Sequence, residues 1–332
     1  MPQVAPPTTP HTGADGEPLR VLLASPRGFC AGVERAIRIV EEALEQCGAP
    51  VYVRHEIVHN VHVIARLKAM GAVFIDDIDD APDDRPLILS AHGSARAIHE
   101  NAERRGLRLV DATCPLVLKV HNRARRLTER GYHIILIGHH GHQEVTGTLG
   151  QVPANKMSLV ANVIDVESLD LPEDARGGPI AYVTQTTLSV DETSAIIEAL
   201  KARFPDIHGP DAADICYATS NRQDAIRAIA PQSDLVIVIG SQSSSNSRRM
   251  VEVSRDHGAK KAILIDGPDG FDWSCLEGVA NLGLSSGASV PEDLVEGFLE
   301  ALAGRRTFSI EPVEVASETI SFKMPPSLKA AV

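Results

Sequence analysis

Apolar positions along the chain fall into two patterns that alternate. Short apolar runs such as residues 21–24 are typical of buried strands, whereas other segments have apolar residues every three or four positions, as in a helix. After the run at 21–24, Val33, Ile37 and Val40 recur at helical spacing, and a Cys-Gly pair at 47–48 closes the pattern. Alternating strands and helices predict an α/β protein with parallel sheets.

Three cysteines mark a repeat within this alternation. Cys30, Cys114 and Cys216 each stand where a helical pattern begins, and an apolar run follows each helical pattern. The positions 24 residues after the cysteines all fall where these apolar runs end, which predicts an internal repeat. Chance similarity between α/β segments is the alternative. Polar residues follow the runs: His55 and His59, then residues 139–142, then residues 241–246.

A second apolar run occurs later in each unit and also ends in polar residues. His92, Thr186 and Ser289 follow these runs, 62, 72 and 73 positions after their cysteines. Parallel sheets bind ligands beyond the carboxyl ends of their strands. If the three units surround one axis, the cysteines and this ring of His, Ser, Thr and Asn side chains meet at one central pocket.

The three repeat cysteines are candidate metal ligands. They lack the short spacing of common zinc sites, although a three-cysteine zinc site with histidine or water as the fourth ligand stays open. Thiolates also bind iron–sulfur clusters, and three of them on a four-iron cluster would leave one iron without a protein ligand. Cys47, near a helix C-terminus, and Cys275, in an irregular segment, are interpreted as structural.

The polar residues after the strands are of the kinds that bind an anion. The segment 241–247 follows a strand pattern and opens a helix, so its hydroxyls, amide and backbone N–H groups could hold a phosphate. Neither the P-loop motif nor the GxGxxG dinucleotide motif occurs. His59 and His92 could add charged donors, although a single such histidine is more often a surface or capping residue.

The stretch 138–148 contains the best candidate for acid–base chemistry. His142 and Glu144 stand two positions apart after a strand, so both could face one side of an extended loop. Glu144 in a closed pocket could act as a general acid. A metal-binding or merely solvated loop is the alternative.

Composition narrows the class of protein. The chain has 332 residues, of which 43% are hydrophobic and 23% charged, and a net charge of −12. These values fit a globular protein and argue against binding nucleic acid or anionic membranes through overall charge. No apolar run approaches the roughly 20 residues of a membrane span, and the N-terminus lacks the apolar core of a signal peptide. We therefore expect a cytoplasmic protein.

Nine short stretches carry a resemblance to a known family. They are PRGFCAGVERAI, YVRHEIVHN, SAHG, DATCPLVLKVH, IGHHGHQEVTGT, TQTTLSVDET, DICYATSNRQ, SSSNS and GAS. Together they resemble the 4-hydroxy-3-methylbut-2-enyl diphosphate reductase family, which performs the last step of the non-mevalonate isoprenoid pathway. The resemblance runs from about Val21 to about Pro325 and leaves the Pro-rich lead outside.

The resemblance implies three α/β lobes with small, mainly parallel sheets around one central 4Fe–4S cluster. Cys30, Cys114 and Cys216 would hold this cluster and leave one iron open. Glu144 would donate a proton, and His142 and Thr186 would lie by the hydroxyl end of the substrate. The diphosphate contacts would be His59, His92, Ser244, Ser245, Asn246 and Ser289.

The resemblance also implies a reaction and an electron donor. The family removes the allylic hydroxyl of its substrate with two electrons and yields isopentenyl and dimethylallyl diphosphate. Ferredoxin or flavodoxin is the usual donor, and both are acidic, so docking on this acidic chain would need a local basic patch. Arg123, Arg125, Arg126 and Arg130 could form such a patch, or simply a solvated helix face.

The expected domain organisation has five segments. They are a disordered Pro-rich lead at 1–18, lobes at 19–113, 114–214 and 215–303, and a C-terminal extension at 304–332 that packs back on the body. Two other functions stay open. One is a zinc hydrolase that acts on a phosphorylated substrate through the same thiolates and His142. The other is an iron–sulfur sensor, which would leave Glu144 and the polar ring unexplained.

Overall fold

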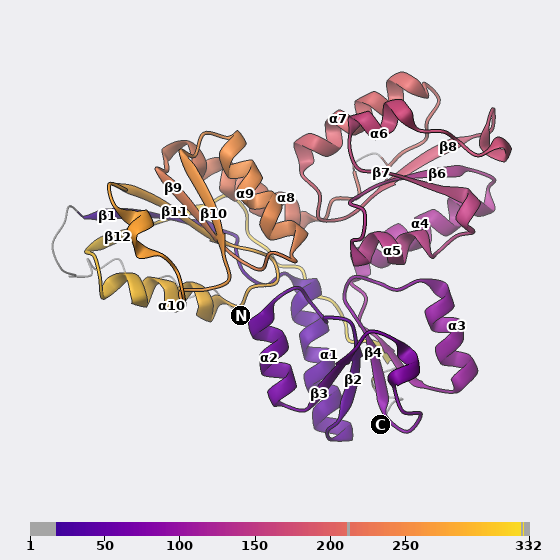
Figure 1. Cartoon of the computed structure of the whole chain (residues 1–332), viewed down its shortest axis with the longest axis horizontal. Helices are drawn as coiled ribbons and strands as arrows, with labels where there is room; N and C mark the ends of the chain where they lie inside the picture. The colour runs from indigo at the N-terminus through magenta and orange to yellow at the C-terminus, as the bar shows by residue number, and fades with distance from the viewer. Residues whose placement is uncertain (1–17, 211–212, 327, 329–332) are drawn as a thin grey trace. The chain divides into compact units, whose positions relative to one another are not determined.

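Three small sheets organise the chain. The structure is a computed structural model that describes residues 18–210, 213–326 and 328. Every pairing between its described strands is parallel (Figure 1). The α/β class with small parallel sheets, which the strand–helix alternation predicts, is thereby confirmed. The lead expected to be disordered at 1–18 lies, apart from Pro18, outside the described residues.

Two compact units divide the described chain. The first contains the residues up to Cys30, His59–Val61 and Tyr217–Ile320. The second contains Ala31–Val58, His62–Cys216 and the residues from Ser321 onward. One sheet lies in the first unit and two lie in the second.

The first unit is built on a five-stranded sheet. The strands, in order across the sheet, are β10 (Lys261–Ile265), β9 (Leu235–Ile239), β11 (Asn281–Ser286), β1 (Leu19–Ser25) and β12 (Phe308–Glu314). The helices are α8 (Tyr217–Ile229), α9 (Ser245–Asp256) and α10 (Glu292–Ala303), with short 3-10 helices η4 (Ala230–Gln232) and η5 (Trp273–Leu276).

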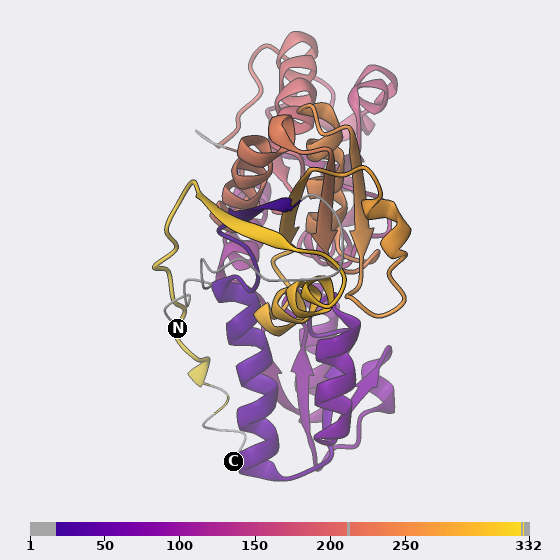
Figure 2. The same ribbon diagram turned by 90° about the vertical axis from the view of Figure 1, so that its left-hand side faces the viewer.

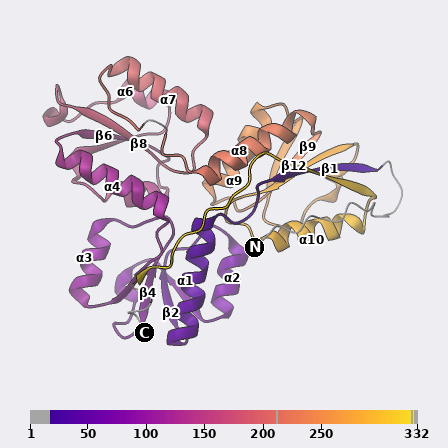
Figure 3. The same ribbon diagram turned by 180° about the vertical axis from the view of Figure 1, so that it is seen from behind.

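Alternation along β1 explains why helices cover both faces of this sheet. Val21 and Leu23 join the apolar cluster that contains Phe298 of α10. Leu22 and Ala24 join the cluster on the opposite face, to which α8 and α9 contribute. Both faces are apolar and each is covered by helices, as parallel sheets require (Figures 1 and 3).

The second unit contains a four-stranded and a three-stranded sheet. The first has the order β3 (Ala72–Ile75), β2 (Val51–Arg54), β4 (Pro86–Leu89) and β5 (Arg108–Asp111). Its helical elements are α1 (Ala31–Cys47), α2 (Val61–Ala69), η1 (Ile78–Asp80) and α3 (Arg96–Arg105). The second sheet has the order β7 (Met157–Val160), β6 (His133–Ile137) and β8 (Ile180–Thr184). Its helical elements are α4 (Pro115–Glu129), α5 (Gln143–Leu149), η2 (Ala154–Lys156), α6 (Val163–Ser168), η3 (Glu173–Ala175) and α7 (Val190–Arg203).

The repeat that the cysteine spacing predicts has a counterpart in the sheets. In each sheet the two strands that the repeat predicts are direct neighbours: β2 pairs with β4, β6 with β8, and β9 with β11. The helices α1, α4 and α8 each begin one residue after a repeat cysteine. Each repeat unit therefore runs from a cysteine through a helix into a pair of adjacent strands.

Strand β1 pairs with strands that are distant in the sequence. The expected boundaries place it in the lobe 19–113, but it pairs with β11 and β12 in the first unit (Figure 2). β12 comes from the segment expected as a C-terminal extension and pairs with β1 from Leu19↔Phe308 to Ser25↔Glu314. The three-lobe division remains a proposal, and in it we now assign β1 to the third lobe.

Local sequence signals account for several helix ends. Pro115 is the first residue of α4. Proline is favourable there, because the backbone N–H that it lacks would have no hydrogen-bond partner within the helix. The Ser189 side chain accepts the N–H of Glu192 at the start of α7, and Gly106 ends α3 in the left-handed conformation, with φ of 68°. Among the helices of the described residues, none combines the length and apolar character needed to cross a membrane.

Candidate active site

The three predicted cysteine ligands lie in turns that are built alike. Cys30, Cys114 and Cys216 are half-buried, and a helix begins at the residue after each of them. The backbone N–H of each cysteine donates to a carbonyl oxygen two positions beyond the end of a strand. The acceptors are Ala288 after β11 at 3.1 Å, Ala91 after β4 at 3.0 Å and Thr186 after β8 at 3.1 Å, respectively.

The chemistry of these donors fits a thiolate-bound metal group. None of the five cysteines, all of them in the described chain, forms a disulfide. A helix N-terminus presents the positive end of its dipole, which favours a thiolate. Cys30 belongs to the first unit, and Cys114 and Cys216 belong to the second. Within the described residues no three His, Cys, Asp or Glu side chains gather into a metal-binding group, so joint ligation by these cysteines is a proposal.

The other two cysteines have different surroundings. Cys47 is the last residue of α1, where the helix dipole disfavours a thiolate. Cys275 lies in η5 and packs against the apolar cluster around Phe298, and Lys261 Nζ donates to its sulfur at 3.8 Å. These positions agree with their interpretation as structural residues.

Glu144 is a buried carboxyl held by one residue. It lies in α5, and its side chain is 2% exposed. The backbone N–H of Thr186 donates to Oε1 at 2.7 Å, and the Thr186 hydroxyl donates to Oε2 at 2.9 Å. The structure thus brings together two residues that lie 42 positions apart in sequence, one after β6 and one after β8.

Burial raises the pKa of Glu144 from 4.5 to about 7. The loss of water around the carboxylate is the main cause, and the negative charge of Asp214 adds to it. The two hydrogen bonds from Thr186 act in the opposite direction, because they stabilise the charged form. Near neutral pH the carboxyl group therefore keeps a proton in a large fraction of molecules, as a general acid must.

Two histidines accompany Glu144 in the second unit. His142 is the N-cap of α5, and its Nδ1 accepts the N–H of Glu144 at 3.1 Å, which places the proton of the neutral ring on Nε2. The ring of His92, from the turn after β4, lies edge-on to the His142 ring with 6.1 Å between centroids. The predicted residues His92, His142, Glu144 and Thr186 therefore lie in one unit, around the ends of β4, β6 and β8.

The serine-rich segment forms the N-terminus of α9 in the first unit. Ser244 is the N-cap and accepts the N–H of Ser247 at 3.3 Å. Ser245 and Asn246 lie in the first turn and are 1% and 4% exposed. The Asn246 Nδ2 donates weakly to the Met250 sulfur at 3.6 Å, and the buried Oδ1 has no hydrogen-bond partner among the described residues. The Nδ2 group can therefore donate to a ligand as well.

The remaining predicted diphosphate contacts also lie in the first unit. Ser289 follows β11, and its hydroxyl donates to the carbonyl oxygen of His59 at 2.9 Å. The structure thus joins His59, which follows the first apolar run of one repeat unit, to Ser289, which follows the second run of another. A Cβ at Gly287, in the turn before Ser289, would lie 2.1 Å from Ser247 Oγ, so a larger residue there would displace this serine side chain.

Sequence reasoning missed two buried polar residues of the second unit. Asp214, two positions before Cys216, pairs with Arg123 at 2.6 Å and raises the pKa of Glu144. His121 of α4 is 3% exposed, and burial lowers its pKa to about 4. Its ring packs under Gly93, where a Cβ would lie 2.6 Å from the ring and where φ is +85°. The only sequence signal for Asp214 is a charged residue two positions before a cysteine, and His121 gives none beyond its helical position.

Three of the four arginines proposed as a docking patch are engaged in local contacts. Arg123 pairs with Asp214, Arg125 donates to Gln151 Oε1 at 3.3 Å, and Arg126 donates to the carbonyl oxygen of Asn122 at 3.2 Å. These contacts favour the alternative that they belong to a helix face. A donor-docking role for this patch stays a prediction without structural support.

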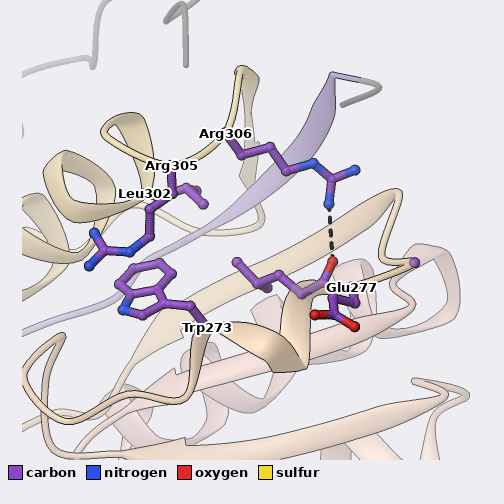
Figure 4. A pocket seen from close by; sticks show the side chains of 7 residues that line it. Trp273, Glu277, Leu302, Arg305 and Arg306 are labelled. Carbon is purple, nitrogen blue, oxygen red and sulfur yellow. Dashed lines mark hydrogen bonds between the residues drawn. The ribbon is translucent and has the colours of Figure 1, made fainter. Parts of the chain in front are cut away.

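A hollow of about 370 Å³ in the first unit is unrelated to the predicted site residues. Trp273, Leu276, Glu277, Arg305 and Arg306 are among its lining residues, and the Arg305 guanidinium lies 4.3 Å from the Trp273 ring centre (Figure 4). These residues precede β11 and β12, so the hollow lies where the strands begin. The predicted site residues of this unit lie after the strands, at their carboxyl ends, and the hollow lies at their amino ends.

Comparison with known proteins identifies the family. The family model described as LytB protein matches residues 21–303. The chain belongs to the LytB protein family. The match begins within β1 and ends with α10, so the LytB region contains all predicted site residues.

Relatives of the LytB family agree over nearly the whole chain. A protein of Phenylobacterium zucineum (strain HLK1) is 54% identical over 311 residues, which are 94% of this chain and 98% of that protein. A protein of Gluconobacter oxydans (strain 621H) is 53% identical over 311 residues, with 92% of each chain covered. Both are named 4-hydroxy-3-methylbut-2-enyl diphosphate reductase.

Solved structures agree with the LytB assignment. The E-1-hydroxy-2-methyl-but-2-enyl-4-diphosphate reductase of Plasmodium falciparum has a TM-score of 0.89 and 40% identity, covering 94% of this chain and 98% of that one. A second structure, of an (E)-4-hydroxy-3-methyl-but-2-enyl diphosphate reductase described as the terminal enzyme of the non-mevalonate pathway, has a TM-score of 0.62 and 30% identity. It covers 86% of this chain and 99% of that one.

The raised pKa of Glu144 predicts a pH-dependent stability. Below the unfolded-state pKa of 4.5 the carboxyl is protonated in both states, and as pH rises through about 7 the folded state loses stability because it disfavours the charge. Glu144→Gln should therefore be more stable than wild type at pH 8 by up to about 3 kcal/mol, but not at pH 4.5. Urea denaturation at both pH values measures this difference. The exposed Glu173→Gln is the control, and equal stabilities of Glu144→Gln and wild type at pH 8 would contradict the assignment.

Proposed function

We propose that the chain removes the allylic hydroxyl of (E)-4-hydroxy-3-methylbut-2-enyl diphosphate by reduction, and forms isopentenyl and dimethylallyl diphosphate. Membership in the LytB family and the names of the relatives support this reaction. The observation that carries the proposal is Glu144, a buried carboxyl with a pKa of about 7 held by Thr186. A reductive dehydroxylation at neutral pH needs such a proton donor, because hydroxide is a poor leaving group.

Cys30, Cys114 and Cys216 would hold one 4Fe–4S cluster and leave one iron without a protein ligand. A cluster of this kind supplies two electrons in succession and a Lewis-acidic iron for the substrate oxygen. Three thiols at the starts of three helices are a donor set suited to it, and the equal backbone hydrogen bonds of the three cysteine turns support their shared role. The ligand number and the cluster type belong to the proposal.

Glu144 protonates the leaving oxygen in this mechanism. Its proton passes to the substrate hydroxyl, the carbon–oxygen bond breaks, and the oxygen leaves as water. Two electrons and a second proton complete the balance, and the carbon that receives the second proton decides between the two products. Thr186 holds both carboxyl oxygens, and the Nε2–H of His142 would donate toward the hydroxyl end of the substrate.

The diphosphate would be bound by the polar residues that follow the strand ends. Ser244, Ser245 and Asn246 open the 12-residue helix α9, whose N-terminal N–H groups and dipole favour an anion. The Nδ2 group of Asn246, which makes a weak hydrogen bond to the Met250 sulfur at 3.6 Å, can donate to a phosphate oxygen, and this supports the role. His59 and Ser289 in the first unit and His92 in the second complete the proposed contacts.

Asn246→Asp should weaken substrate binding strongly. The substitution places a carboxylate where the amide meets the diphosphate, and the loss of one hydrogen bond to a charged group corresponds to an increase in KM of about 10- to 100-fold. The exposed Gln232→Asp, which adds the same charge before β9, at the other end of the strand that leads into this segment, is the control and should keep KM within about twofold. If both variants raise KM equally, Asn246 is not a substrate contact.

The cofactor proposal is tested by purification without oxygen. We expect a brown protein with a broad band near about 400 nm, about four irons and four sulfides per chain, and bleaching by dithionite. A colourless protein with one zinc per chain would support a hydrolase and contradict the reductive mechanism. A ferredoxin or flavodoxin as electron donor, and the cytoplasm as the location, remain predictions from the sequence and the family resemblance.

A further inference from the structure

Arg35 links the helix after one cysteine to the turn before another. It lies in α1, which begins after Cys30, and its side chain reaches the residues just before Cys114 (the same helix is seen from behind in Figure 3). The acceptors of its guanidinium are the carbonyl oxygens of Ala112 at 3.3 Å, Thr113 at 3.1 Å and Lys323 at 2.8 Å. Arg35 is 8% exposed, so these carbonyl groups replace the water that its charge has lost.

Arg123 makes the corresponding link from the next helix. It lies in α4, which begins after Cys114, and its Nη1 donates to Asp214 Oδ1 at 2.6 Å. Asp214 stands two positions before Cys216. Its side chain is 3% exposed, whereas that of Arg123 is 25% exposed. The ion pair therefore ties a buried carboxylate of the Cys216 turn to the outer part of α4.

Arg222 makes the third link, in the first unit. It lies in α8, which begins after Cys216, and it is fully buried. Its Nη2 donates to the carbonyl oxygen of Gly28 at 2.6 Å, two positions before Cys30, and its Nε reaches the same oxygen at 3.2 Å. Glu318 accepts from Nη1 at 3.0 Å and neutralises the buried charge.

The three links follow one rule. Each arginine lies on the helix that follows one cysteine, and each binds the residue two positions before another cysteine. Those residues are Ala112, Asp214 and Gly28. Taken in chain order the links form a cycle, from the helix of Cys30 to the turn of Cys114, from the helix of Cys114 to the turn of Cys216, and from the helix of Cys216 to the turn of Cys30.

We propose that Arg35, Arg123 and Arg222 are positioning residues that hold the three cysteine turns in the conformation that binds the iron–sulfur cluster. This role rests on the proposed function, because it assumes that the cysteines bind the cluster. The arginine contacts themselves do not depend on the cluster, and each lies within a single unit. Each cysteine turn is held by the backbone hydrogen bond of the cysteine itself and by the arginine of the preceding repeat unit. Local hydrogen bonds add to these contacts, such as the one from the Gly28 N–H to Ser286 Oγ at 3.0 Å. Loss of the arginine removes the one contact that ties the turn to the helix of another cysteine.

The decisive experiment measures each cysteine separately. Whole-chain protein freed of iron is treated with iodoacetamide, and the alkylation rate of each cysteine is followed by peptide mass spectrometry. Arg123→Gln should speed alkylation of Cys216 about tenfold, because one charge-assisted hydrogen bond of its turn is lost. Arg35→Gln should do the same for Cys114. In each variant the cysteine at the start of the mutated helix should stay within about twofold.

Matched variants separate positioning from general destabilisation. Arg126→Gln in α4 and Arg38→Gln in α1 remove exposed arginines of the same helices and should change no cysteine. Asp214→Asn should reproduce the effect of Arg123→Gln, and the double variant should add nothing to it. Arg222→Lys, which keeps the buried charge but loses the forked geometry, should speed alkylation of Cys30 and tests the third link without stranding Glu318.

The anaerobic holoenzyme gives a second readout. Arg123→Gln should lose iron to a chelator about tenfold faster than wild type and Arg126→Gln, and Arg123→Lys should restore part of the difference. Two results would overturn the positioning proposal. One is an equal rise in the alkylation rates of all cysteines in a variant, and the other is a set of rates unchanged from wild type. If wild type binds no cluster while the alkylation pattern is as expected, the proposed function fails and the positioning role of the arginines stands only as a property of the thiol turns.

Discussion

Replacing Glu144 by glutamine is expected to lower turnover by about 100- to 10,000-fold, which is the usual contribution of a positioned general acid. Glutamine fills the same space and can keep both contacts with Thr186, but it has no proton to give to the leaving oxygen. Iron content and substrate affinity should stay at the wild-type level, because Glu144 lies in neither the cysteine turns nor the α9 segment. Steady-state kinetics with a chemical reductant measure the effect.

The pH profile provides the control within the same experiment. Turnover of wild type should fall as pH rises through about 7, where Glu144 loses its proton, and the low activity of Glu144→Gln should lack this step. Glu173→Gln, at an exposed site, should match wild type throughout. Near-normal turnover in Glu144→Gln, or a step that persists in it, would remove Glu144 from the proton-donor role.

Replacing any one of Cys30, Cys114 and Cys216 by alanine is expected to abolish reductase activity and to lower iron content from about four per chain to less than about one. A cluster with only two protein ligands leaves two irons exposed to water and oxygen. Iron and sulfide analysis after anaerobic purification measures this loss, and circular dichroism shows whether the fold persists.

The two remaining cysteines serve as matched controls. Cys47→Ala and Cys275→Ala remove half-buried thiols outside the repeat, and both variants should keep the brown colour, the iron content and the activity of wild type. Loss of iron in Cys275→Ala, or retention of four irons in Cys114→Ala, would show that the ligand set is wrong.

Most of the local structure is predictable from periodicity. The helices after the three cysteines begin and the paired strands occur where the apolar spacing places them, since burial of one helix face or of both strand faces leaves a direct pattern in the sequence. Sheet membership is different. β1 pairs with β11, more than 250 residues away in sequence, between Leu23 and Leu284 for example, and a strand buried on both faces has the same composition whichever neighbour it has.

In the site, too, the sequence pattern predicts some features, whereas others depend on tertiary packing. The cysteines and the polar residues after the strands are visible as a repeat, and the family resemblance supplies their roles. The hydrogen bonds of Thr186 to Glu144, and the burial that raises the pKa of Glu144, depend on packing between segments 42 positions apart. The arginine links could not be predicted, because two of them end on backbone carbonyl groups, which every residue type provides.

Product analysis under anaerobic conditions tests the central claim most directly. The iron-loaded protein is incubated with (E)-4-hydroxy-3-methylbut-2-enyl diphosphate and reduced methyl viologen, and the diphosphates are identified by mass spectrometry. We predict conversion to isopentenyl and dimethylallyl diphosphate, with two viologen electrons consumed per product and no phosphate released. Unchanged substrate in the presence of about four irons per chain, or release of phosphate without electron consumption, would contradict the reductase function.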